Sequence, residues 1–357
     1  MSDRLAPRSL RPGEEGRLLD LFGAVYGAGW RDRTCVDRYL GNSAPTASVS
    51  VDEQDGTIVG AQPSFDLPLW VAGADATATT LVDVVTHPSY RRQGIFAALV
   101  DHAVRLAGER GAAVVLTTPN RISYPGFRKK SSWRLLATLE CWVRPLRTEG
   151  LLRGALGLPR PLASGLAIPF RPFLDWLPRR QPGTTASGSP AWPDDRALEG
   201  LWNRCAPVAG IVIRRDPAWF RWRFSPGAGS RYACIEKNLE DGRLSGYAVT
   251  TLRQVGRLGV AFLVDALCHP DDARAPARLI EGVCDWGLAH GAAIAAVYCI
   301  PGSRWSVAAR GCGFWRLPAR LTRRPYRVCA SLGPVASGGR LLDPGAWQLS
   351  AADSDLL

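Results

Sequence analysis

The stretch THPSYRRQGIFAALVD, residues 86–101, contains a basic turn with a glycine between two apolar segments. It follows an apolar run at 81–85 that predicts a buried strand, and beyond residue 94 the apolar residues recur with helical spacing. A helix that begins directly after a glycine-containing turn presents backbone N–H groups without intrahelical partners. With the neighbouring arginines, these groups predict an anion site, and a diphosphate is the ligand that suits it.

The turn at residues 91–96 also carries a family resemblance. It resembles the acyl-CoA signature of the GCN5-related N-acetyltransferase (GNAT) superfamily, Arg/Gln-x-x-Gly-x-Gly/Ala, and departs from it by having Phe96 at the last position. The resemblance covers about residues 3–145. It implies an α/β fold with a mixed sheet and the CoA turn after the fourth strand. The alternative is a basic surface turn before an ordinary helix.

The resemblance further implies which residues contact acetyl-CoA or another acyl-CoA. Backbone amides at Val84, Val85 and Thr86 would pair with the pantetheine arm and polarise the thioester carbonyl, as in an oxyanion hole. The residues expected at the diphosphate are Arg91, Arg92, Gln93, Gly94, Ile95 and Phe96. Asn120 is expected to contact the pantetheine or the catalytic tyrosine.

Composition sets the broad class of the protein. The 357 residues, 46% hydrophobic and 21% charged, are typical of a globular protein with two domains. The net charge of +12 suits CoA, but it would also suit nucleic acid or an anionic membrane surface. Because no zinc-finger spacing or RNA-binding aromatic signature accompanies the charge, we do not expect a nucleic-acid partner.

Cysteine usage and the absence of long apolar runs predict a cytoplasmic location. Nine cysteines are scattered without a CxxC pair, which indicates buried, reduced thiols and no bound metal. The N-terminal residues lack the apolar core of a signal peptide. No window reaches the ~18 uninterrupted apolar residues that a transmembrane helix needs. The oligomeric state is not predicted.

The second half of the sequence repeats the first. Residues 263–270, LVDALCHP, match residues 81–88, LVDVVTHP, and GAAIA at 291–295 matches GAAVV at 111–115. Such internal repetition predicts tandem GNAT-like domains. The expected organisation is an acyl-CoA-binding domain at 1–145, a connector at 146–194, a degenerate GNAT-like domain at 195–335 and a tail at 336–357.

The two copies differ at the turn. In the second copy the turn has no glycine, and it carries Asp271 and Asp272 at the helix start. Aspartates there cap a helix well but repel a diphosphate. We therefore expect the second domain to have lost CoA binding.

Local patterns predict the elements of both copies. Strands are expected at 47–51, 57–66, 77–86, 112–118, 133–144, 231–236, 246–252 and 260–267. Helices are expected at 12–23, 30–40, 95–111, 195–205, 275–288 and 303–311. Within the connector, residues 151–177 are rich in Pro, Leu and Arg. This segment fits either peripheral contact with a membrane or packing over the seam between the halves.

Acyl transfer to an amine needs groups that move protons. A Tyr-x-x-Phe pattern at Tyr124 and Phe127 is similar to the matching region of Eis-type acetyltransferases, which implies that Tyr124 protonates the leaving thiolate. Asp83 is a candidate base because a carboxylate in an apolar strand is costly unless it is paired or used. Its twin Asp265, in the copy expected to be inactive, allows a purely structural role instead. Asp66 on the neighbouring strand is a second candidate.

These observations predict an N-acyltransferase, most simply an N-acetyltransferase. The expected acceptor is a small-molecule primary amine on an amino sugar, a polysaccharide precursor or a natural product, attacking directly in a ternary complex. This step rests on family analogy. The alternatives are an aminoacyl-tRNA-dependent transferase and a non-catalytic CoA-binding protein.

Overall fold

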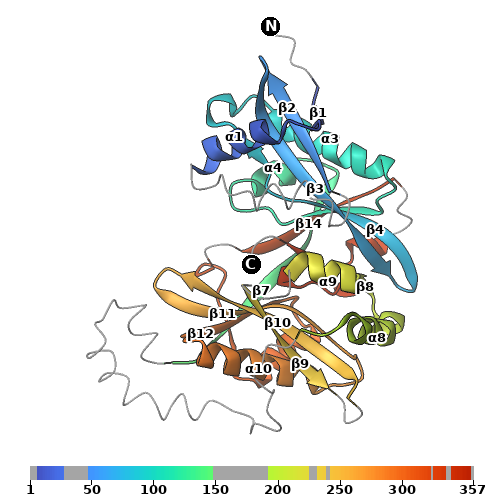
Figure 1. The fold of residues 1–357 in the computed structure, drawn as a ribbon, viewed down its shortest axis with the longest axis vertical. Coiled ribbons are helices and arrows are strands. Elements are labelled where there is room, and N and C mark those ends of the chain that lie inside the picture. Colours follow the sequence, from blue (N-terminus) through green and yellow to red (C-terminus); the bar gives the residue numbers. More distant parts are fainter. Residues whose placement is uncertain are drawn as a thin grey trace. The chain divides into compact units, whose positions relative to one another are not determined.

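The structure is a computed structural model, which describes residues 6–27, 47–147, 192–224, 231–238, 242–322, 325–334 and 339–354. It forms two compact units of mixed α/β structure, and the elements of each are labelled in Figure 1. The first unit consists of residues 1–137, 210–214 and 327–347. The second consists of residues 138–209, 215–326 and 348–357.

The first unit is built on a mixed sheet with strand order β1-β2-β3-β4-β6-β14, in which only β4 and β6 pair in parallel. Two short strands, β5 and β8, pair separately with β3. The strands are β1 (Arg8–Ser9), β2 (Ala47–Gln54), β3 (Thr57–Val71), β4 (Ala74–Leu81), β5 (Val85–Thr86), β6 (Val114–Thr117), β8 (Ile211–Ile213) and β14 (Tyr326–Leu332). The helices are α1 (Glu15–Tyr26), α3 (Ile95–Glu109) and α4 (Tyr124–Arg128).

Helix α3 packs on the sheet of the first unit through a close approach at Gly60. A Cβ at residue 60 would lie 2.5 Å from Cγ2 of Ile95 and 2.9 Å from Cδ1 of Leu99. Ile95 and Leu99 are buried with Val59. On the same helix, Val100 and Ala103 join a second buried cluster that includes Phe127 of α4. Glycine at position 60 thus sets how near the start of α3 comes to strand β3.

The second unit has the strand order β7-β12-β11-β10-β9, with β13 also paired to β7. Strands β11 and β12 are parallel and the other pairs are antiparallel. The strands are β7 (Trp133–Pro145), β9 (Tyr232–Asn238), β10 (Leu244–Val255), β11 (Leu258–Cys268), β12 (Ile294–Cys299) and β13 (Trp315–Arg316). Strand β7 belongs to this unit from Thr138 onward. The helices are α8 (Asp195–Cys205), α9 (Pro217–Phe224), α10 (Ala275–Ala289) and α11 (Arg304–Gly311).

The units do not coincide with the halves of the sequence, because each takes a strand from the other half. Strand β7 comes last in the first repeat, yet from Glu140 onward it pairs with β12 of the second unit. Strand β14 comes last in the second repeat, yet it pairs with β6 of the first unit. The boundary expected at residue 145 follows the sequence repeat, whereas the compact units exchange their final strands. The tail at 336–357 is also divided between the two units, with residues up to Trp347 in the first and those from Gln348 in the second.

Most expected elements are present. The mixed α/β fold class is confirmed, α8 spans the residues predicted for it, and α3 and α10 lie within two residues of their predicted ends. The expected strand at 77–86 differs, since β4 ends at Leu81 and β5 begins at Val85. The expected helix at 30–40 and the segment 151–177 lie outside the described residues.

Two further features bear on the class of the protein. No helix within the described ranges is long and apolar enough to cross a membrane. The eight cysteines that the structure describes are buried free thiols. Burial raises the pKa of several of them, Cys141 and Cys329 to about 11, which keeps these thiols protonated and unreactive at neutral pH.

Candidate active site

The site is centred on a break between β4 and β5. Strand β4 runs parallel to β6 as far as the pair Leu81 and Thr117. The chain then turns at Asp83, whose φ of 43° is unusual for a residue other than glycine, and β5 continues beside β3. The Gln62 side chain fixes the break by donating to the carbonyl of Val82 at 2.7 Å. Beyond Thr117 the two parallel strands therefore no longer pair.

The break leaves one edge of β5 open. His87 donates its backbone N–H to the carbonyl of Val59 at 2.8 Å, and Val85 lies opposite Ala61 of β3. Because peptide groups alternate along a strand, those of Thr86 point away from β3. Among the described strands, β3 is the only partner of β5. An extended chain with amide groups could pair with this edge.

The predicted anion turn follows β5 directly. Residues 88–90 form a short 3₁₀ turn, Arg92 has a φ of 65°, and Gly94 adopts the left-handed conformation with a φ of 79° before α3. The N-cap residue of α3 is Gly94, which has no side chain to cap the helix, and the first helical hydrogen bond runs from Ala98 N–H to the Gly94 carbonyl at 3.1 Å. The helix start thus offers N–H groups beside the exposed Arg91 and Arg92.

The side chains of Ile95 and Phe96 point into the protein. Ile95 is buried against Val59, so only its backbone is available to a ligand. Phe96 packs on Phe127 with ring centroids 5.2 Å apart. The space for Phe96 comes from Gly126, where a Cβ would lie 2.6 Å from the Phe96 ring. A glycine on α4 therefore accommodates the bulky residue that replaces Gly or Ala in the signature.

Tyr124 begins α4 and is held by Asn120. The Asn120 carbonyl accepts the N–H of Tyr124 at 3.0 Å, and its side-chain oxygen accepts the N–H groups of Ile122 and Ser123 at 2.8 and 3.0 Å. Arg327 of β14 places its guanidinium 4.3 Å from the centroid of the Tyr124 ring. Within the described part of the chain the phenol hydroxyl makes no hydrogen bond, so it is available to a ligand.

The two candidate carboxylates lie in different settings. Asp83 is half-buried at the break itself. Asp66 lies two residues along β3 from Ser64, the partner of Leu81. It accepts hydrogen bonds from Arg110 at 2.5 and 2.9 Å and from Thr79 at 2.6 Å. Its carboxylate is thus already occupied in tying the end of α3 to the sheet.

The second copy lacks the break. Strand β11 continues through Asp265 to Cys268, and its only irregularity in the pairing with β10 is a bulge at Val264, directly before Asp265. Helix α10 begins at a turn closed by Asp272, whose carboxylate accepts the N–H groups of Arg274 and Ala275 at 3.1 and 2.9 Å. The helix start that is open in the first copy is therefore capped by a carboxylate in the second.

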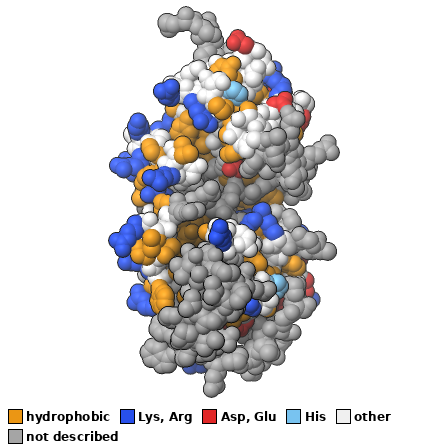
Figure 2. Space-filling model, turned by 90° about the vertical axis from the view of Figure 1, so that its left-hand side faces the viewer, with side chains coloured by type: hydrophobic (Ala, Val, Ile, Leu, Met, Phe, Trp, Pro, Cys, Tyr) orange, Lys and Arg blue, Asp and Glu red, His pale blue; other side chains and the backbone are white. Residues whose placement is uncertain are grey.

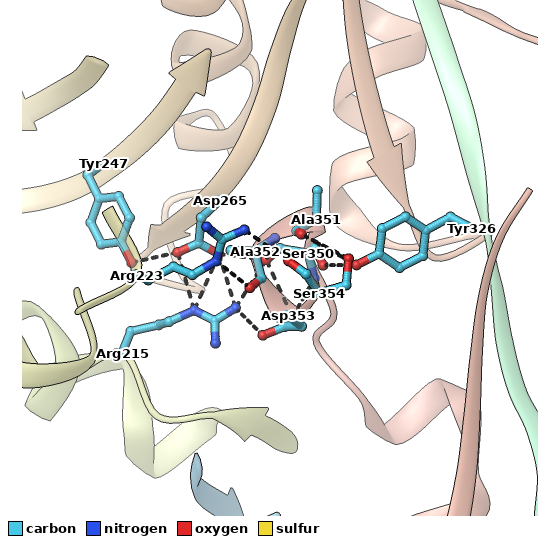
Figure 3. A network of polar contacts seen from close by, with 10 residues as sticks. All are labelled: Arg215, Arg223, Tyr247, Asp265, Tyr326, Ser350, Ala351, Ala352, Asp353 and Ser354. Carbon is cyan, nitrogen blue, oxygen red and sulfur yellow. Dashed lines mark hydrogen bonds and ion pairs between the residues drawn. The ribbon is translucent and has the colours of Figure 1, made fainter. Parts of the chain in front are cut away.

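Asp265 is a structural residue in a buried polar network (Figure 3). It accepts hydrogen bonds from Arg215 at 3.0 Å, from Tyr247 at 2.9 Å and from Ser350 at 2.7 Å. Arg215 also pairs with Asp353 at 2.8 Å. Burial works against the charge of Arg215, but the two carboxylates outweigh burial and raise its pKa. The network ties the tail at 348–354 to the sheet of the second unit.

Basic side chains are common on the surface, as the composition predicts. On the face shown in Figure 2, Lys and Arg are widespread and Asp and Glu are sparse. Near the site, the residues outside the turn that add exposed positive charge are Arg121, Arg128 and Lys129. This charge favours an anionic ligand. No group of acidic, His and Cys residues arranged to hold a metal occurs in the ranges described above.

Comparisons with known proteins agree with this geometry. Residues 6–135 match the family model described as Acetyltransferase (GNAT) domain. A sequence search among curated proteins finds no match. The fold is similar to that of a probable N-acyltransferase from Enterococcus faecalis, with a TM-score of 0.61 and 12% identity over 92% of this chain and 73% of that one.

Two other solved structures extend the similarity. A GCN5-related N-acetyltransferase from Anabaena variabilis matches with a TM-score of 0.60 and 10% identity, over 91% of this chain and 71% of that one. The Saccharomyces cerevisiae N-myristoyltransferase with bound myristoyl-CoA matches with a TM-score of 0.62 and 13% identity. This match covers 98% of this chain and 92% of the myristoyltransferase chain. At these identities the likeness concerns the fold.

Proposed function

We propose that this chain, whose residues 6–135 match the GNAT domain model, is an acyl-CoA-dependent N-acyltransferase. In this proposal it acetylates a primary amine on an amino sugar, a polysaccharide precursor or a natural product. The observation that carries the proposal is the break at Asp83, because it joins an open strand edge to an uncapped helix start. Duplication of the domain, with CoA binding kept only in the first copy, is part of the proposal.

In this proposal the open edge and the turn hold acyl-CoA. Backbone groups of Val84 and Thr86 pair with the pantetheine arm, whereas those of Val85, which was also expected to do so, face β3. The turn from Arg91 to Phe96 holds the diphosphate through its N–H groups and arginines. Strand β5 supports the first part because its edge is open. The N–H groups near the thioester would stabilise the oxyanion that forms during attack.

The chemical step is a direct displacement. The neutral amine attacks the thioester carbonyl carbon, a C–N bond forms, the C–S bond breaks, and the amine nitrogen loses a proton while the thiolate gains one. We assign the proton donor to Tyr124, whose hydroxyl has no partner among the described residues. An alkylamine has a pKa of about 10.4 and must lose a proton before it attacks.

We assign the base to Asp83, acting directly or through water. It lies at the break, within the segment that would flank the thioester, and it is half-buried. Asp66 is the second candidate, because it lies on β3 away from the break, where it pairs with Arg110 and accepts a hydrogen bond from Thr79. Asn120 acts in this proposal mainly by holding Tyr124 in place.

The test measures thiol release from acetyl-CoA with a panel of primary amines. We expect Tyr124→Phe and Asp83→Asn each to lower kcat by about 100-fold or more, as loss of a general acid or base does, while CoA affinity is retained. Tyr26→Phe is the matched control, because Tyr26 is an exposed tyrosine on α1, where it stacks on Phe22. Tight CoA binding without turnover of any amine would instead favour a non-catalytic CoA-binding protein.

A transferase that uses aminoacyl-tRNA is the alternative that the basic surface permits. The uncapped start of α3 supports CoA as the donor instead, since a small diphosphate fits such a site. Calorimetry with acetyl-CoA and with charged tRNA separates the two. Binding of tRNA without binding of acetyl-CoA would reverse the assignment.

A further inference from the structure

Arg327 lies at the break although it comes from the far end of the sequence. Strand β14 pairs with β6 so that Cys329 lies opposite Thr117, the last residue of β6. Thr117 in turn pairs with Leu81, where β4 ends. Arg327 comes two residues before Cys329, so it extends beyond the end of β6. The register therefore brings Arg327 to the place where β4 and β6 stop pairing.

The Arg327 side chain points to the same face as Tyr124. Alternate residues of a strand share a face, and Cys329 lies in the buried cluster with Phe127 and Trp133. The guanidinium of Arg327 lies 4.3 Å from the centroid of the Tyr124 ring. Its charge also opposes the rise in the pKa of Cys329 that burial causes. The charge is therefore directed toward the site.

Arg327 has no anionic partner among the described residues. Arg327 is half-buried. Among the described residues, its guanidinium contacts the ring of Tyr124 and makes no hydrogen bond or ion pair. Two acidic groups of the same unit are occupied elsewhere, Asp66 by Arg110 and Asp101 by Lys130 at 2.5 Å. A guanidinium packed over an aromatic face keeps its N–H groups free at the edge, where they can bind a carboxylate or a phosphate with two hydrogen bonds.

We propose that Arg327 binds an acidic group of the acceptor, so that the preferred acceptor is an amine that also carries a carboxylate or a phosphate. This inference rests on the proposed function, since it takes Tyr124 as the residue next to the reacting thioester. The diphosphate of CoA is assigned to the turn at residues 91–94 and does not need Arg327. An acceptor held through its acidic group would present its amine close to the thioester.

The test compares pairs of amines that differ in the acidic group. Glucosamine 6-phosphate against glucosamine tests a phosphate, and β-alanine against its amide tests a carboxylate. The measured quantity is the ratio of kcat/KM for the acidic member to that for the neutral one. We expect Arg327→Met to lower this ratio by about 10- to 100-fold for the preferred pair, mainly through KM, because a hydrogen-bonded charge is lost.

Two variants and two binding measurements complete the experiment. Arg327→Lys keeps the positive charge but loses the planar guanidinium that can make two parallel hydrogen bonds. The ratio should therefore fall by less than in Arg327→Met. Arg105→Met is the matched control, because Arg105 is exposed on α3 and pairs with Glu109, and it should leave the ratio unchanged. The affinity for acetyl-CoA should be the same in all variants. In the wild type, inorganic phosphate or acetate should compete with the acceptor and not with acetyl-CoA.

The outcomes separate this inference from the proposed function. Turnover of neutral and acidic amines with a ratio that Arg327→Met does not change would overturn the inference and leave the acyltransferase standing. Absence of turnover with every amine would overturn both. If Arg327→Met does not fold, the ratio for Arg327→Lys and the competition by phosphate or acetate decide the question.

Discussion

The two copies of the Leu-Val-Asp stretch show how one sequence pattern can serve two purposes. In the first copy the strand ends before Asp83, and the chain turns there with a positive φ. In the second copy the strand continues, and Asp265 is buried against Arg215. The same pattern therefore occurs in two settings, and the local backbone and the groups around each carboxylate decide its role.

The helix that follows shows the same contrast. Helix α3 begins after Gly94 without a side-chain cap, whereas α10 begins after a turn in which Asp272 caps the first N–H groups. The Asp272 carboxylate satisfies these N–H groups within the chain, and its charge repels anions. The difference teaches that a turn before a helix can either leave N–H groups for a ligand or satisfy them with a side chain that stabilises the helix.

The largest effect is expected for Arg215→Met in the second unit. This change leaves Asp265 and Asp353 buried without a cation, which should lower the free energy of unfolding by about 3–5 kcal/mol. The neighbouring Arg214→Met is the control, because Arg214 pairs with the exposed Asp75 and should cost less than about 1 kcal/mol. Urea unfolding measures both, and equal losses would show that the network does not stabilise the unit.

The next effect concerns CoA affinity at the turn of the first copy. Gly94→Asp and Gly94→Asn have the same shape, and both residues tolerate a positive φ, so they differ chiefly in charge. We expect acetyl-CoA to bind about 100-fold more weakly to the Asp variant than to the Asn variant, or about 2.7 kcal/mol. Calorimetry measures both affinities.

The control for this pair is a new carboxylate at the turn of the second copy. Ala273 is exposed there, and Ala273→Asp should leave the affinity for acetyl-CoA unchanged. Equal affinity of Gly94→Asp and Gly94→Asn would mean that the diphosphate does not lie at the start of α3.

Features with a local signal could be predicted from the sequence. Helices α8 and α10, the turn at Gly94 and the capping aspartate of the second copy follow from neighbouring residues alone. The break at Asp83 could not be predicted, because the run 77–86 is apolar enough for one strand and the break depends on pairing with β3. Sequence patterns do not report such pairing.

The candidate site was predictable only in part for the same reason. The turn and Tyr124 lie in one stretch of sequence, and a resemblance could identify them. Arg327 reaches the site because β14 pairs with β6 across more than 200 residues of sequence, and no local signal marks it. Gly60 and Gly126 are needed because a Cβ at either position would clash with a neighbouring side chain. Those neighbours are known only once the structure is known.

A smaller effect tests how the first copy accommodates Phe96. Gly126→Ala places a methyl group 2.6 Å from the Phe96 ring, and such overpacking should cost about 1–3 kcal/mol. In the double variant, Phe96→Ala should remove most of the cost of Gly126→Ala. By itself, Phe96→Ala should lower stability because it leaves a cavity. A double-mutant cycle by thermal unfolding measures the coupling. Additive effects would show that the two residues do not interact.

The smallest effect contrasts the first helices of the two copies. Helix α8 is capped locally by Asp194, which accepts the N–H of Ala197 at 2.7 Å. Before α1, Glu14 instead accepts two hydrogen bonds from Arg8, both at 2.7 Å, and one from the backbone of Arg11. The Arg8 contact, followed by the Arg11 N–H, lowers the pKa of Glu14 from 4.5 to about 2.

A carboxylate whose pKa is lower in the folded state stabilises the fold above its unfolded pKa. The contribution of Glu14 should therefore be complete above about pH 5 and fade as the pH falls from 4.5 toward 2. Glu14→Gln should be less stable than the wild type at pH 7, and the two should converge near pH 2. Thermal unfolding across this range measures the difference. A difference between Glu14→Gln and the wild type that stays the same from pH 7 to pH 2 would argue that the ionised Glu14 carboxylate does not stabilise the start of α1.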